Sequence, residues 1–96
     1  MIRVVTRLSV RPKNRARVMQ NAPRLVELFE RHGLRSEGVF ENFHECEVIH
    51  LWSAPDMAAY DAATVSIRND PEFRAFAGEA AELIETERKE YWRSSG

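Results

Sequence analysis

A chain of 96 residues has room for one hydrophobic core, so we expect residues 1–96 to form a single domain. A net charge of -1, with acidic and basic residues interspersed, gives no electrostatic reason to expect binding to nucleic acid or to a membrane. The lone cysteine, Cys46, cannot form an internal disulfide, and the N-terminus lacks the long apolar stretch of a signal peptide. We therefore expect a cytoplasmic protein.

The first segment, residues 2–10, shows the two-residue alternation of a β-strand. One face of this strand carries the mostly apolar set Ile2, Val4, Thr6, Leu8 and Val10. The other face carries Val5 between two arginines, Arg3 and Arg7. A turn over residues 11–14 ends the strand.

The next segment, residues 15–32, has the apolar spacing of an amphipathic helix, with Asn14 as its expected N-cap. Gly33 suits the left-handed position just beyond the helix end. Pro23 lies inside this helix and removes one backbone hydrogen bond. Because the apolar stripe keeps its phase across the proline, we expect one kinked helix rather than two.

Two strands are predicted to follow, over residues 34–43 and 46–53, joined by a hairpin loop at residues 42–45. So short a connection requires the two strands to be antiparallel. Gly38 inside the first of them indicates a β-bulge.

The second half contains a helical region broken in two and then a strand. Asp56 is the expected N-cap of a helix over residues 57–68, and Asp70 with Pro71 restarts the helix. The residues expected to face inward are Met57, Tyr60, Ala63 or Thr64, Ile67, Phe73, Phe76, Ala77, Ala80 and Ile84. Residues 86–93 form the last strand, whose many charges are typical of a sheet edge.

The resulting order, β-α-β-β-α-β, predicts an α+β ferredoxin-like fold, with a four-stranded antiparallel sheet and helices on one face. Both faces of the central strands are largely apolar, which indicates burial on both sides. The chain has no further helix for the second face. We therefore expect a homodimer in which two sheets pack face to face.

The sequence resembles the NIPSNAP family of the dimeric α/β-barrel superfamily. The resemblance rests on the segments at residues 48–52 and 68–76, with support from residues 11–13 and 30–33. It implies a small barrel or cleft in each subunit. The superfamily includes monooxygenases, isomerases, cyclases and proteins without known activity, and many of its enzymes use no metal or organic cofactor. The resemblance therefore implies a cofactor-free protein without selecting a reaction.

His50 is the candidate catalytic residue, because a histidine among apolar neighbours is held neutral and can accept a proton near neutral pH. The alternative is a structural histidine whose ring is fully hydrogen-bonded. Thr6 could orient a ligand or bond to nearby backbone. Trp52 and Tyr60 could line a pocket for a planar molecule or belong to the ordinary core.

The remaining polar clusters indicate no second chemistry. Glu41, His44, Glu45 and Glu47 surround the hairpin without a recognised metal-ligand spacing, so we expect a solvated turn and no metal site. Cys46 lies between two glutamates, which disfavours its thiolate form and any nucleophilic role.

Two functions are consistent with these features. One is a small cofactor-independent enzyme, of the isomerase, cyclase or monooxygenase type, acting on a hydrophobic cyclic or aromatic molecule, as in bacterial secondary metabolism. The other is a non-catalytic NIPSNAP-type binding or scaffold protein. A pocket that holds His50 with a second polar side chain favours the enzyme, and a sheet face sealed by side chains favours the scaffold.

Overall fold

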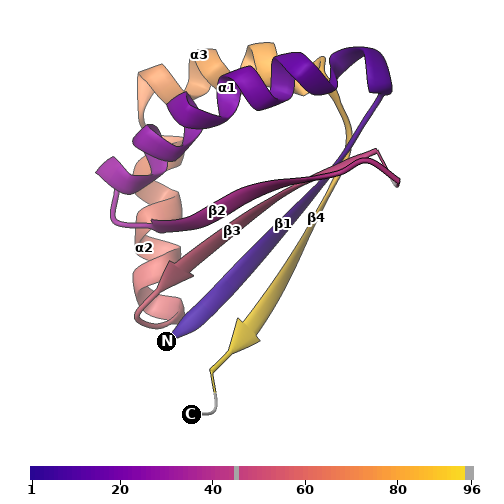
Figure 1. The fold of residues 1–96 in the computed structure, drawn as a ribbon. Coiled ribbons are helices and arrows are strands. Elements are labelled where there is room, and N and C mark those ends of the chain that lie inside the picture. The colour runs from indigo at the N-terminus through magenta and orange to yellow at the C-terminus, as the bar shows by residue number, and fades with distance from the viewer. Residues whose placement is uncertain (45, 95–96) are drawn as a thin grey trace.

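The structure is a computed structural model that describes residues 1–44 and 46–94. Its elements are β1 (Ile2–Val10), α1 (Pro12–Arg31), β2 (Arg35–Asn42), β3 (Glu47–Ala54), α2 (Met57–Arg68), α3 (Pro71–Ala81) and β4 (Ile84–Arg93). The strands form one antiparallel sheet in the order β2-β3-β1-β4. The three helices lie on one side of it (Figure 1). This arrangement confirms the predicted ferredoxin-like α+β fold.

The first helix begins earlier than predicted. Pro12 occupies the first helical position and Arg11 the N-cap position, so Asn14 lies inside the first turn and is not the cap. Proline suits this place because its fixed φ angle is already helical and it has no N–H to leave unpaired. As predicted, α1 runs through Pro23 as one helix and ends before Gly33, whose φ is +100°.

The caps of the two later helices are confirmed. The Asp56 carboxylate accepts a hydrogen bond from the Ala59 N–H at 2.8 Å, and the Asp70 carboxylate accepts one from the Glu72 N–H at 2.9 Å. Met57 does not face inward as predicted, because it opens the first turn of α2 on the exposed side.

Ile84 is not part of the α3 stripe, as had been expected, but the first residue of β4. It pairs with Val10 beyond an irregularity between Ser9 and Val10. The last strand therefore begins two residues before the predicted start at residue 86.

The hairpin between β2 and β3 shows one confirmed and one corrected prediction. Gly38 has a φ of +142° and lies at a register shift in the β2–β3 ladder, which is the expected bulge. Cys46 has a φ of +51° and belongs to the turn, so β3 begins at Glu47 and not at Cys46. Glu45, part of the predicted loop and acidic cluster, lies outside the described residues.

The two faces of the sheet differ in what covers them. The helix face packs on the helices and holds the core, in two clusters whose buried sheet residues are Ile2, Val4, Leu8, Val10, Val48, Trp52 and Ala54. The open face carries the half-buried Val5, Ile49 and Leu51, with the exposed Phe40 and Trp92 on its outer strands. Within the described residues, no helix is long and apolar enough to cross a bilayer.

Candidate functional site

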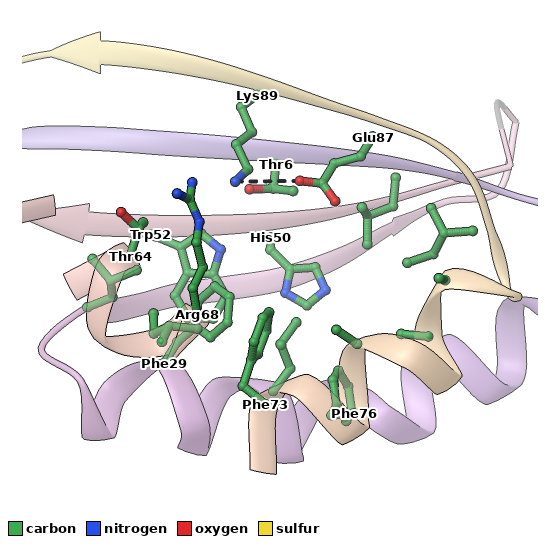
Figure 2. A pocket seen from close by; sticks show the side chains of 18 of the residues that line it. Thr6, Phe29, His50, Trp52, Thr64, Arg68, Phe73, Phe76, Glu87 and Lys89 are labelled. Carbon is green, nitrogen blue, oxygen red and sulfur yellow. Dashed lines mark ion pairs between the residues drawn. The ribbon is translucent and has the colours of Figure 1, made fainter. Parts of the chain in front are cut away.

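A pocket of about 450 Å³ lies between the helix face of the sheet and the helices α2 and α3. Its floor is formed by β1 and β3, one side by β4 and the other by the helices (Figure 2). A cavity of this volume is of the size that holds a small organic molecule. The structure places all four predicted residues, Thr6, His50, Trp52 and Tyr60, on its lining.

The strand register explains how the polar residues of the floor come together. His50 of β3 pairs with Thr6 of β1, and Thr6 pairs on its other side with Lys89 of β4. On the far side of His50 the row ends at Val39 of β2. Directly paired residues point to the same face of a sheet, so this row turns from apolar to cationic across the helix face, and His50, Thr6 and Lys89 line the pocket.

His50 is the buried polar group of this row. The residue is 2% exposed, and its ring points away from the sheet toward Phe73 and Phe76 (Figure 2). Burial lowers the pKa of His50 from 6.5 to about 4, because the charged imidazolium is poorly solvated there. Its Nδ1 atom is buried and has no hydrogen-bond partner in the described chain. Within the described residues, no protein group binds Nδ1 as the structural alternative raised above would require.

Aromatic rings form the wall next to His50. Trp52 follows it on the same face of β3, and the two ring centroids are 5.7 Å apart with their planes inclined by 29°. Phe29 of α1 lies 4.7 Å from Trp52 and 5.7 Å from Phe73 of α3. Three elements thus supply one apolar wall, suited to a flat hydrophobic ligand.

Tyr60 lies on α2, at one end of the pocket. It is buried, and its ring meets that of Tyr91 edge to face at 5.6 Å. Burial, with further contributions from Tyr91, raises the pKa of the Tyr60 hydroxyl above its ordinary value. Tyr60 therefore stays a neutral phenol at physiological pH and can contribute a wall or a hydrogen bond, but no charge.

Charged side chains form the mouth of the pocket, and sequence reasoning missed their position. Glu87 and Lys89 of β4 form an ion pair at 3.5 Å, and Glu85 pairs with Arg11 at 3.4 Å. Arg68, the last residue of α2, also lines the pocket and forms no ion pair with any described residue. The sequence had predicted only a charged edge strand here, and the β1–β4 register shows that Glu87 and Lys89 point to the helix face of the sheet.

A second polar cluster ties α1 to the start of α3. The His32 Nε2 and an Asp70 carboxylate oxygen are 2.7 Å apart, and Arg31 donates a hydrogen bond to Glu72 at 2.7 Å. The hydrogen bond with His32 holds the pKa of the Asp70 carboxyl below its usual value. This cluster lies outside the pocket and fixes the helix layer that forms the pocket wall. Residues 1–44 and 46–94 contain no group of three or more His, Cys, Asp or Glu arranged to hold a metal ion.

Solved structures with the same architecture identify the fold. An uncharacterized NIPSNAP domain protein from Burkholderia xenovorans matches with a TM-score of 0.91 and 12% identity, over 100% of this chain and 96% of its own. A NIPSNAP family protein with unknown function from Agrobacterium tumefaciens matches with a TM-score of 0.86 and 16% identity, over 98% and 87%. The chain shares the ferredoxin-like fold of these NIPSNAP proteins. No family model matches the sequence, and no curated protein matches it significantly.

The same fold also occurs in a putative antibiotic biosynthesis monooxygenase from Nitrosomonas europaea. That protein matches this chain with a TM-score of 0.77 and 8% identity, over 100% of both chains. Identities this low establish a shared fold and leave the chemistry to be argued from the pocket.

Proposed function

We propose that this chain is a NIPSNAP-type, cofactor-independent enzyme that binds a hydrophobic cyclic or aromatic molecule in the pocket and uses His50 as a base. The observation that carries the proposal is the buried Nδ1 of His50, which has no partner among the described residues and lies on the wall of a cavity of about 450 Å³. An unpaired buried polar atom costs about 1–3 kcal/mol, and a ligand that donates a hydrogen to it removes that cost.

The neighbours of His50 support removal of a proton from carbon. The proton would pass from a carbon next to a carbonyl to Nδ1, and the electron pair of the broken C–H bond would form an enolate. Thr6, paired with His50 in the sheet, can donate its hydroxyl hydrogen to the enolate oxygen. Return of the proton at another carbon gives isomerisation, and attack of the enolate on a second carbonyl gives cyclisation.

The low pKa of His50 sets the kind of substrate. A group with a pKa of about 4 is always neutral near pH 7 but is a weak base. It can deprotonate only an acidic C–H group, such as one between a carbonyl and an aromatic ring. The aromatic wall built on Trp52 and Phe73 would hold such a ring.

Deuterium exchange tests this proposal without knowledge of the natural substrate. β-Tetralone has an acidic CH₂ between its carbonyl and its aromatic ring, and base catalysis in heavy water replaces those hydrogens. We expect the protein to accelerate the exchange, followed by NMR, and His50→Gln to reduce it to the buffer rate. His44→Gln, a histidine in the exposed hairpin, is the matched control and should exchange at the wild-type rate.

The possible results separate the two functions. Equal exchange by wild type and His50→Gln, with both folded by circular dichroism, would show that His50 is not the base. Binding of β-tetralone without acceleration by the wild-type chain would favour the non-catalytic binding protein.

We also propose that the open face pairs with the open face of a second copy. Val5 and Leu51 are register partners at its centre, and Ile49 lies next to them. In the single chain these side chains are only half-buried, while Phe40 and Trp92 are exposed. A two-fold pairing would bury this apolar set against itself.

A further inference from the structure

The charges at the pocket mouth do not cancel. Lys89 is compensated by Glu87 at 3.5 Å, and Glu85 is compensated by Arg11 at 3.4 Å. Arg68 remains, with no ion pair to any residue in the described part of the chain. Among the described residues, the mouth therefore carries one uncompensated positive charge, beside an interior of aromatic and aliphatic side chains.

The direction of the Arg68 side chain also bears on the charge at the pocket mouth. Arg68 ends α2, where a cation is favourable with respect to the helix dipole whatever the pocket contains. Its guanidinium, however, lies on the side of the pocket toward Lys89 and Thr6 (Figure 2). Because Glu87 already offsets the charge of Lys89, an anion bound at this opening would balance the remaining charge of Arg68.

We infer that the ligand of this pocket is a planar, mainly hydrophobic carboxylic acid, with its ring against Trp52 and Phe73 and its carboxylate between Arg68 and Lys89. The inference names the substrate class of the proposed function and rests on the same pocket, but it does not depend on catalysis.

Spacing and charge both favour a monoanion with an extended ring system. His50, Thr6 and Lys89 lie on three neighbouring strands, so the Cα atoms of His50 and Lys89 are roughly 10 Å apart. A molecule anchored at Lys89 can therefore place its ring beside His50. The planar guanidinium fork matches a carboxylate with two parallel hydrogen bonds. The two negative charges of a dianion would exceed the single uncompensated positive charge at the mouth.

Calorimetric titration with β-naphthoate and its uncharged analogue β-naphthamide tests the inference. We expect the wild-type chain to bind the carboxylate about ten times more tightly than the amide, which corresponds to one charge-assisted contact. Arg68→Gln should remove that preference and leave the amide affinity within about two-fold of the wild-type value. Arg68→Lys keeps the charge but loses the fork, and we expect an intermediate preference.

Lys13→Gln is the matched control, because it removes the same charge from an exposed site in the first turn of α1, outside the pocket. It should leave the preference for the carboxylate unchanged. Equal binding of carboxylate and amide by the wild type would overturn the inference, but it would still support a pocket that binds the aromatic ring. An equal loss in Lys13→Gln and Arg68→Gln would also overturn the inference. If neither compound binds, both the inference and the proposed pocket are wrong.

Discussion

The two faces of the sheet are made by the same four strands and yet have different properties. Trp52 on the helix face is 2% exposed, and Trp92 on the open face is 60% exposed. The difference comes from the second layer. α1, α2 and α3 cover the helix face and leave a pocket there, whereas the residues of the open face are shielded only by their neighbours (Figure 1).

Polar groups on the two faces differ in the same way. On the open face, Arg7 forms ion pairs with Glu47 and Glu90, and the hydrogen bond with Arg7 holds the pKa of the Glu90 carboxyl below its usual value. On the helix face, the Nδ1 of His50 is buried and has no partner in residues 1–44 and 46–94. The Arg7 cluster of the open face is thus internally paired, while on the helix face a ligand can supply the hydrogen-bond donor that Nδ1 lacks within the described chain.

Removing one tryptophan from each face should give the largest contrast. Trp52→Ala deletes a core ring that packs on Phe29, and we expect a loss of about 3–5 kcal/mol in the free energy of unfolding. Trp92→Ala deletes an exposed ring and should cost less than about 0.5 kcal/mol in the monomer. Urea denaturation in dilute solution measures both values. Similar losses for the two variants would contradict the assignment of the faces.

Acid should destabilise the protein through His50. The unfolded chain protonates this group near pH 6.5, and the folded chain only near pH 4, so stability is full above pH 6.5 and falls as the pH is lowered toward 4. The loss from this one group is about 3 kcal/mol. His50→Gln cannot be protonated and should lack that component. The test is the urea midpoint of each protein, measured across this pH range. The same pH dependence in the wild type and in His50→Gln would contradict the account.

A charge placed on the open face should weaken the proposed dimer. Leu51→Arg puts a guanidinium opposite Val5 in the β1–β3 ladder, and a desolvated charge without a partner should reduce dimer affinity at least about ten-fold, or about 1.4 kcal/mol. Sedimentation equilibrium measures this affinity. Thr64→Arg, on α2 at the pocket, is the comparison and should leave association unchanged. An unaltered dimer affinity in Leu51→Arg would show that the dimer interface does not lie on the open face.

Arg7→Gln should have a small effect on stability. Its ion pairs are partly exposed, with 31% of the Arg7 side chain accessible, and such pairs contribute at most about 1 kcal/mol. We expect the loss to shrink further at about 1 M salt, since screening weakens exposed pairs. A loss of several kcal/mol in the monomer would show that this cluster is a structural centre of the open face.

The sequence predicted the order of elements and the faces of β1, because a two-residue alternation is a local property that folding preserves. It misplaced the helix start at Asn14 because Pro12 fits the first helical position equally well in local terms. It placed Ile84 on a helix because the apolar spacing continued past the point where pairing with Val10 begins the strand.

The site was predictable only where it depends on one strand. His50 and Trp52 share a face of β3, and both line the pocket. Lys89 and Arg68 were missed, because one reaches the pocket through the β1–β4 register and the other through the position of the end of α2. Both are tertiary facts, with no signal in local spacing.

The protonation state of His50 tests the central claim most directly. NMR of the imidazole carbons and nitrogens, assigned with His32→Gln and His44→Gln, follows its titration from about pH 8 downward, with and without β-naphthoate. The account predicts a pKa of about 4 for His50, and ring resonances that shift when the ligand is added. A pKa near 6.5, with resonances unmoved by the ligand, would contradict it.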